Sequence, residues 1–125
     1  MIDGFVKYTA PLDEYEEEVL IPIMVKCLEK HIGKENAITN TEMRCKLAEH
    51  GYGNINEVRV RKIISHIRQE GLVPCLVGTG RGYHVATSVR EVSEYIDSLN
   101  SRIDAMIEVR NAMMLQRDVL KAKEG

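Results

Sequence analysis

Two short helices with their own start signals flank a glycine-rich turn in the middle of this chain. Thr39-Asn40-Thr41-Glu42 has the spacing of a capping box, in which the first and last residues exchange side-chain and backbone hydrogen bonds. It predicts a helix over residues 40–50. A second box, Asn54-Ile55-Asn56-Glu57, predicts a helix that runs to Glu70 and ends at Gly71. The intervening residues 51–56 are a tight turn, so the chain is restricted to two closely connected helices.

The second helix has an apolar face and a face rich in hydrogen-bond donors. Steps of 100° per residue bring together Val60, Ile63, Ile64 and Ile67. The remaining arcs carry Arg59, Arg61, Lys62, Ser65, His66, Arg68 and Gln69. Such a helix suits the major groove of a duplex, where cations neutralise phosphates and Arg, Gln and Asn read base edges. The alternative is a solvated basic helix without a nucleic-acid partner.

A glycine-dense β-hairpin is predicted directly after this helix. The apolar run at residues 72–77 and the segment at residues 83–86 are the two strands, and Gly78-Thr79-Gly80-Arg81-Gly82 is the turn. Arg81 at its tip can reach a neighbouring groove or phosphate backbone. These glycines match neither a phosphate-binding loop nor a dinucleotide fingerprint, because the Gly-Lys-Ser/Thr ending and the strand–turn–helix context are missing.

Apolar residues at helical spacing also predict a first helix over residues 12–30, bent or divided at Pro22 because proline cannot donate a backbone hydrogen bond. Its start carries an acidic run at residues 13–18, which we expect to cap the helix and remain in solvent. Ala37-Ile38 is expected to be a short extended piece between the first helix and the second.

The order of helix, short strand, capped helix, turn, basic helix and hairpin resembles the winged helix-turn-helix superfamily over residues 12–87. Residues 56–68, followed by Gly71-Leu72-Val73-Pro74 and Gly82-Tyr83, are similar to small winged-helix proteins of bacterial phages and mobile elements. The resemblance implies an α+β, mostly α fold, with residues 54–70 as the recognition helix and residues 72–86 as the wing. A single cation at the wing tip is sparse, which makes the helix the stronger expected contact.

Charge is distributed unevenly along the chain. The net charge of −2 by itself argues against a nucleic-acid partner. Residues 44–90, however, contain eight Lys and Arg against three Asp and Glu, whereas residues 1–43 contain four against nine. A local basic surface on a nearly neutral protein is typical of a nucleic-acid footprint.

A long helix is expected at the C-terminus. Ser88-Val89-Arg90-Glu91 is a third capping box, and helical patterning continues without Gly or Pro to about Lys123, roughly 50 Å of helix. Its apolar positions follow a heptad: Val92, Ile96, Leu99, Ile103, Met106, Met113 and Leu120. A second stripe through Ile107, Met114 and Leu115 could take over from the first or make a broader bundle. Beyond Leu99 we expect homodimerisation, and the alternative is a helix folded back on its own domain.

Catalytic, metal and membrane functions are not expected. Three cysteines without CxxC spacing indicate reduced thiols, and four histidines are scattered over separate elements. A zinc site would need Cys27 and His31 together with Cys45 and His50, but the second pair would diverge on a helix. The longest apolar run is too short to span a membrane, and the start lacks a secretory cleavage site. We therefore expect a cytoplasmic protein that is not an enzyme, without cofactor or metal.

The sequence thus predicts two domains, residues 1–87 and 88–125, in a dimeric double-stranded DNA-binding protein, most simply a transcriptional regulator of a phage or mobile element. The expected groove-facing residues are Asn56, Arg59, Lys62, Ser65, His66 and Gln69. The expected phosphate contacts are Arg61, Arg68 and Arg81. Two alternatives stay open: a protein-interaction adaptor that uses the acidic first helix or the long last helix, and a replication-organising DNA binder without sequence preference.

Overall fold

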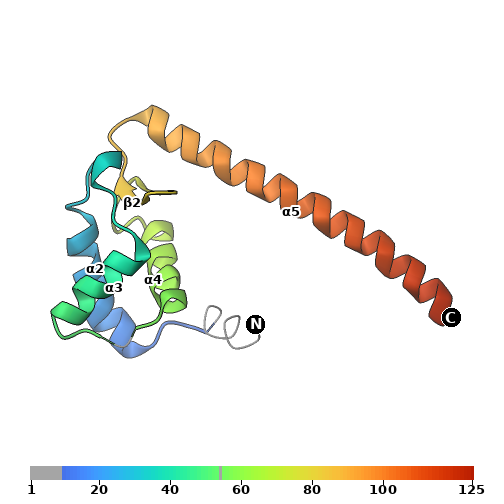
Figure 1. Cartoon of the computed structure of the whole chain (residues 1–125), viewed down its shortest axis with the longest axis horizontal. Coiled ribbons are helices and arrows are strands. Elements are labelled where there is room, and N and C mark those ends of the chain that lie inside the picture. Colours follow the sequence, from blue (N-terminus) through green and yellow to red (C-terminus); the bar gives the residue numbers. More distant parts are fainter. Residues whose placement is uncertain (1–9, 54) are drawn as a thin grey trace. The chain divides into compact units, whose positions relative to one another are not determined.

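The computed structural model describes residues 10–53 and 55–125 and divides into two compact units, residues 1–89 and 90–125. The fold is α+β and mostly helical, with one small antiparallel hairpin (Figure 1). In chain order the elements are η1 (Glu16–Leu20), α2 (Ile21–Leu28), η2 (Lys34–Asn36), α3 (Asn40–Glu49), α4 (Glu57–Gln69), β1 (Leu76–Thr79), β2 (Gly82–Val85) and α5 (Val89–Glu124).

The first helix is continuous from Glu14 through η1 and α2, and it widens before Pro22 instead of breaking. Proline has no backbone N–H, and its ring clashes with the carbonyl four residues earlier. The π-type turn of η1 accommodates both effects: the N–H of Ile21 donates to the carbonyl of Glu16, five residues back. Asp13 caps the start, since its Oδ1 accepts from the backbone N–H of Glu16 at 2.8 Å.

The predicted capping box at the start of α3 is confirmed. Thr39 Oγ1 accepts from the backbone N–H of Glu42 at 3.1 Å, and Glu42 Oε1 accepts from the N–H of Thr39 at 3.0 Å. These hydrogen bonds lower the pKa of Glu42 below its usual range. The helix ends at Glu49, within one residue of the prediction.

The start of α4 differs from the prediction. Its N-cap is Asn56, whose Oδ1 accepts from the backbone N–H of Arg59 at 2.9 Å, so the helix begins at Glu57. The predicted box begins at Asn54, which lies outside the described residues, and its register is wrong by two positions. An asparagine in extended conformation directly before the helix satisfies a free N–H of the first turn, and Asn56 has that conformation.

The hairpin is shorter than predicted on its first side. Strand β1 begins at Leu76 and pairs with β2 from Leu76↔Val85 to Thr79↔Gly82, so Gly80 and Arg81 form a two-residue connection. Residues 72–75 are a turn because Pro74 cannot donate a hydrogen bond and Cys75 has a left-handed φ of 62°.

The predicted extended piece before α3 pairs with the hairpin. The N–H of Ile38 donates to the carbonyl of Tyr83 at 2.9 Å, and the N–H of Tyr83 donates to the carbonyl of Ile38 at 2.8 Å. This close approach requires glycine at position 82, which has φ of 118° and where a Cβ would collide with the Ile38 carbonyl. The extended residue between the first helix and α3 therefore fixes the hairpin to the helices.

The core of the first unit lies between α2, α3, α4 and the hairpin, which Figure 1 shows side by side. The apolar face predicted for α4 is confirmed: Val60, Ile63, Ile64 and Ile67 are each at most 1% exposed. They pack in one cluster with side chains of the other helices, among them Leu20, Met24, Leu28, Met43 and Leu47. The opposite face of α4 is therefore oriented away from the core by packing.

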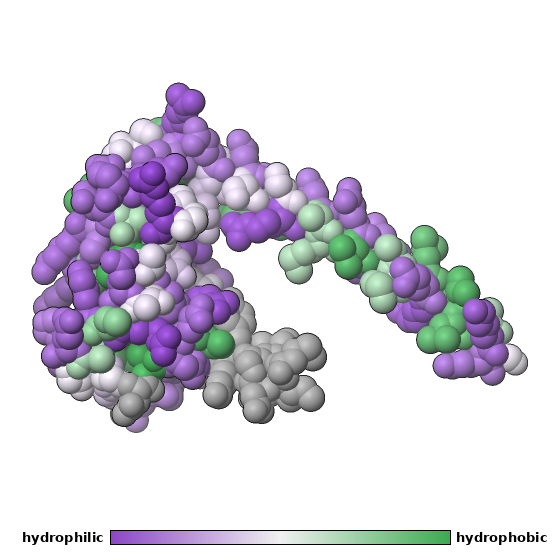
Figure 2. All heavy atoms as spheres, viewed as in Figure 1, coloured by the Kyte–Doolittle hydropathy of each residue, from purple (hydrophilic) through white to green (hydrophobic). Residues whose placement is uncertain are grey.

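The predicted long C-terminal helix is confirmed as α5, an unbroken helix of 36 residues. None of its residues is buried within the described chain. Figure 2 shows apolar side chains gathered along its C-terminal half. Large exposed apolar residues there include Ile103, Met106, Ile107, Val109, Met113, Met114, Leu115, Val119 and Leu120. Among residues 10–53 and 55–125, no helix combines the length and apolarity required to cross a membrane.

Candidate nucleic-acid interface

The outer face of α4 carries a polar row formed by Lys62, Ser65 and Gln69. Helical geometry places these three residues opposite the buried face, three and four positions apart. Gln69 Nε2 donates to Ser65 Oγ at 3.3 Å, which links two members of the row. This row is the surface that the sequence predicts for base contacts.

A shallow groove of about 210 Å³ runs along the polar row and is shared with the start of the first helix. Its lining includes Lys62, Ser65, His66 and Gln69 on one side and Pro11, Leu12 and Glu17 on the other. Lys62, Ser65 and His66 are consequently half-buried, whereas Gln69 is exposed. The Glu17 carboxylate at the border of this groove reduces the positive potential of the row.

Arg59 is not on this surface, which corrects its prediction as a groove-facing residue. Its Nη2 lies 2.6 Å from Glu16 Oε1 and its Nε 2.9 Å from Glu16 Oε2, a bidentate ion pair. Its guanidinium also donates to the carbonyls of Ala10 and Pro11 at 2.9 and 3.1 Å. The side chains of Arg59 and Glu16 are only 13% and 6% exposed. Arg59 therefore fastens α4 to the first helix.

Glu16 corrects the prediction that the whole acidic run is solvated. The ion pair with Arg59 lowers the pKa of Glu16, chiefly through the side-chain hydrogen bonds, and raises the pKa of Arg59. The Glu16 carboxylate also accepts from the N–H of Asp13 at 2.9 Å. Both oxygens are thus hydrogen-bonded, which is the condition under which a charged carboxylate tolerates burial.

Asn56 and Arg68 also have structural positions. The Oδ1 of Asn56 caps α4 by accepting from the backbone N–H of Arg59, which fixes the orientation of this side chain at the start of the helix. Arg68 Nε donates to the carbonyl of Leu76 at 3.2 Å, and the guanidinium lies 5.9 Å from the ring centre of Tyr83. We therefore reassign Asn56 to helix capping and Arg68 to the junction of α4 with the hairpin.

Two predicted phosphate contacts lie on exposed surface. Arg61 Nη2 is 2.9 Å from Glu57 Oε1, four residues earlier on α4, and both side chains are more than half exposed. Exposed pairs of this kind contribute little to stability, so a phosphate can replace Glu57 as the partner. Arg81 is exposed in the hairpin connection, where its backbone N–H donates to Thr79 Oγ1 at 3.2 Å.

The predicted dimerisation residues are all in α5 and lie on its surface. Ile96, Ile103, Met106, Met113 and Leu120 are between 49% and 73% exposed, and Leu99 is half-buried. Arg110 and Arg117 occupy heptad positions within the same stripe, as the sequence indicates. The wider set of exposed apolar residues in the second half of α5 extends this stripe well beyond a narrow two-helix seam.

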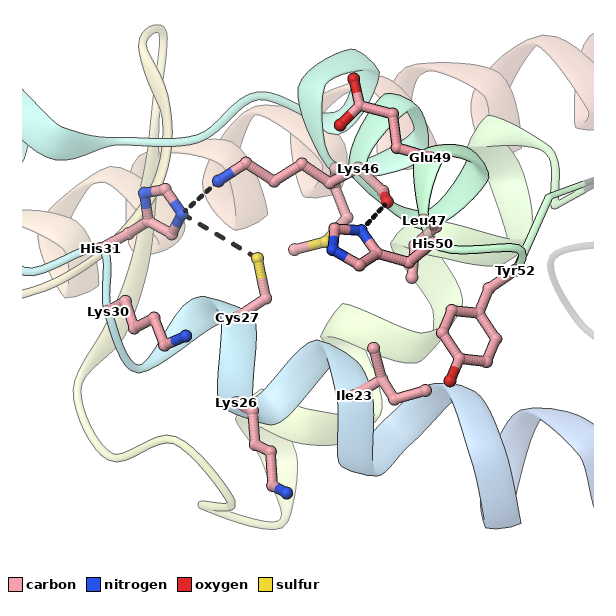
Figure 3. A pocket seen from close by; sticks show the side chains of 11 residues that line it. Ile23, Lys26, Cys27, Lys30, His31, Lys46, Leu47, Glu49, His50 and Tyr52 are labelled. Carbon is pink, nitrogen blue, oxygen red and sulfur yellow. Dashed lines mark hydrogen bonds between the residues drawn. The ribbon is translucent and has the colours of Figure 1, made fainter.

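Sequence reasoning missed a cavity of about 560 Å³ between α2 and α3, shown in Figure 3. Its only sequence signal is the spacing of Cys27 and His31, which we considered for zinc. The two side chains are indeed neighbours, with 4.0 Å between Sγ and Nε2. Within the described residues no three His, Cys, Asp or Glu side chains are grouped to hold a metal ion.

Comparison of the chain with protein-family models, with curated proteins and with solved structures finds no match.

Proposed function

We propose that this chain is a dimeric double-stranded DNA-binding protein of the winged helix-turn-helix type, in which α4 enters the major groove. The observation that carries the proposal is the two-faced packing of α4. One face is at most 1% exposed in the core, and the opposite face presents the row Lys62, Ser65 and Gln69. A helix held rigidly by its apolar face can position donors against base edges.

The proposed winged fold is supported by the arrangement around the hairpin. The extended residue Ile38, between the first helix and α3, pairs with β2, so the three helices and the hairpin share one core. In such an arrangement α3 supports the recognition helix and the hairpin is the wing. Arg81 at the hairpin tip and Arg61 on α4 are the proposed phosphate contacts, and Lys62, Ser65, His66 and Gln69 are the proposed groove contacts.

Self-association through α5 is the second part of the proposal. Its exposed apolar stripe is larger than monomeric proteins usually leave in contact with water. Burial of this stripe against a second copy of α5 would remove the apolar area from solvent and stabilise an oligomer. A two-fold dimer would present two copies of α4 to two half-sites of an operator. A transcriptional regulator of a phage or mobile element is the biological setting that this combination favours.

A charge-reversal experiment tests the α4 surface. Fluorescence anisotropy with a random 30-base-pair duplex at two salt concentrations compares the wild type with Arg61→Glu/Lys62→Glu. We expect wild-type affinity to fall steeply with salt and the double variant to lose binding. The matched control is Lys26→Glu/Lys34→Glu, which makes the same charge change outside α4, the hairpin and α5 and should retain most of the affinity.

Arg59 is excluded from this test because its replacement would disturb packing as well as charge. Equal losses in the two double variants would indicate a general charge effect and contradict a recognition role for α4.

The protein-interaction adaptor is the second candidate, favoured by the exposed apolar residues of α5. If the wild type does not bind the duplex even at the lower salt concentration, the protein-interaction adaptor becomes the better explanation.

A further inference from the structure

The cavity between α2 and α3 has the size and lining of a small-molecule site. Its volume of about 560 Å³ lies within the range of ligand pockets in proteins, about 300–1,000 Å³. One part of its wall is apolar, formed by Ile23, Met43, Leu47 and Tyr52. None of the lining residues belongs to α4, so the cavity is distinct from the proposed DNA surface.

A polar corner of the cavity is organised around His31 (Figure 3). His31 Nδ1 lies 2.7 Å from the carbonyl oxygen of Asn36, an acceptor, so Nδ1 carries the proton and donates. The lone pair of Nε2 therefore faces the cavity. Lys46 Nζ is 3.4 Å from Nε2, and Cys27 Sγ is 4.0 Å from it. The corner thus holds an ammonium group whose other two protons can be donated to a ligand.

The charge around the cavity is predominantly positive. Lys26, Lys30 and Lys46 are among its lining residues, against the single carboxylate of Glu49. Lys30 and Lys46 reach it from opposite sides, one following α2 and the other on α3 (Figure 3). An anionic group placed in the corner would be attracted by these ammonium groups, while an apolar group would be covered by the aliphatic and aromatic wall.

We propose that this cavity binds a small amphipathic carboxylate, with its carboxylate at the ammonium group of Lys46 and its hydrocarbon part against Ile23, Leu47 and Tyr52. An anionic group is favoured because three lysines line the cavity against the single carboxylate of Glu49, and an apolar group is favoured because Ile23, Met43, Leu47 and Tyr52 form one part of the wall. Medium-chain fatty acids have this chemistry, and decanoate is the probe. This site is independent of the DNA-binding proposal.

The cysteines of the chain provide the readout. Cys27 lies in the cavity wall, whereas Cys45 and Cys75 are exposed and absent from the lining, so they are internal references. The full chain is alkylated with N-ethylmaleimide, and mass spectrometry follows the rate at each cysteine with increasing decanoate, held below its micelle concentration. We expect decanoate to slow alkylation of Cys27 at least about tenfold and saturably, and to leave Cys45 and Cys75 unchanged.

Two comparison ligands and two variants separate the parts of the proposal. Decanol lacks the charge and acetate lacks the chain, and both should protect Cys27 far less than decanoate does. Lys46→Gln should raise the Kd for decanoate about tenfold or more, because it removes a charge-assisted hydrogen bond. The matched control Lys34→Gln, outside the lining, should leave the Kd unchanged. Circular dichroism confirms that both variants are folded.

Several results would overturn the proposal. Equal protection of all three cysteines would indicate non-specific surfactant binding. Equal protection of Cys27 by decanol and decanoate would show that the polar corner does not bind the carboxylate. An unchanged Kd of Lys46→Gln for decanoate would likewise show that Lys46 does not bind the carboxylate. Protection of Cys27 by an acidic amphipathic peptide, but not by decanoate, would reassign the occupant to a peptide. None of these outcomes depends on whether α4 binds DNA.

Discussion

Replacing Arg59 by methionine leaves the buried carboxylate of Glu16 without its counter-charge and leaves two backbone carbonyls without their donor. The native side chains are 13% and 6% exposed, and four hydrogen bonds join the guanidinium to Glu16 in the first helix and to the carbonyls of Ala10 and Pro11 before it. Breaking a buried pair by removing one partner costs about 3–5 kcal/mol. We therefore expect the free energy of unfolding of Arg59→Met to fall by about 3 kcal/mol, the lower end because the groups are not fully buried.

A loss of this size is large for a small domain, whose total stability is about 5–15 kcal/mol. Each kcal/mol shifts the Tm of a domain of this length by about 4–8 °C, so the Tm should fall by more than about 10 °C. Urea denaturation measures the free energy in a double-mutant cycle of Arg59→Met, Glu16→Gln and their combination. We expect the double variant to be less destabilised than the sum of the single variants by about 2 kcal/mol.

The dependence on pH gives an independent check with a definite sign. Because the pKa of Glu16 is lowered in the folded state, the unfolded chain binds this proton more readily than the folded chain does. The stabilisation is therefore fully present above the usual pKa of the carboxyl and is lost as the pH falls through the lowered value. The stability difference between wild type and Arg59→Met should shrink over that acidic range. The lowered pKa of Glu42 is common to both proteins and cancels in the difference.

Additive effects in the cycle would refute the ion-pair argument, as would a stability difference that does not change in acid. If Arg59→Met has normal stability but binds the duplex more weakly, the original prediction that Arg59 contacts DNA would be supported instead.

Three further predictions follow from the same geometry. Gly82→Ala should lower the free energy of unfolding, measured by thermal unfolding, by more than about 1 kcal/mol because the new Cβ meets a backbone carbonyl and the φ of this residue is positive. The control Gly80→Ala has open space around the Cβ and should change the free energy of unfolding by less than about 0.5 kcal/mol. Deletion of residues 100–125 should give a monomer by light scattering with much weaker duplex affinity, and an unchanged oligomeric state would contradict the role of α5. Arg81→Ala should weaken binding to all duplexes alike and reduce its salt dependence, while Lys62→Ala should alter sequence preference; identical effects would remove that division of roles.

Local chemistry explains why parts of the fold could be predicted from the sequence. The box at Thr39 and Glu42 needs only residues three apart, and it forms as expected. The apolar spacing of Val60, Ile63, Ile64 and Ile67 identifies the buried face of α4 because helical periodicity is a property of one segment. The absence of Gly and Pro between residues 88 and 124 likewise predicts α5.

Errors occur where a backbone position depends on its neighbours in space. The sequence extends β1 into residues 72–75, but the left-handed Cys75 and Pro74 turn the chain there and the strand begins at Leu76. The start of α4 is displaced because two asparagines at nearby positions are both good caps, and only the path of the turn selects Asn56.

The sequence by itself determined the helix caps, the apolar faces and the concentration of cations around α4, since each of these depends on residues close together in the chain. Only the tertiary structure decided which cations face outward. Arg59 and Lys62 are equally polar in sequence, yet Glu16, more than forty residues earlier, holds one of them in an internal ion pair. The cavity between α2 and α3 likewise arises only when two separate helices pack, because its walls combine side chains from both. Long side chains take their partners from the elements that surround them, and that information is absent from local periodicity.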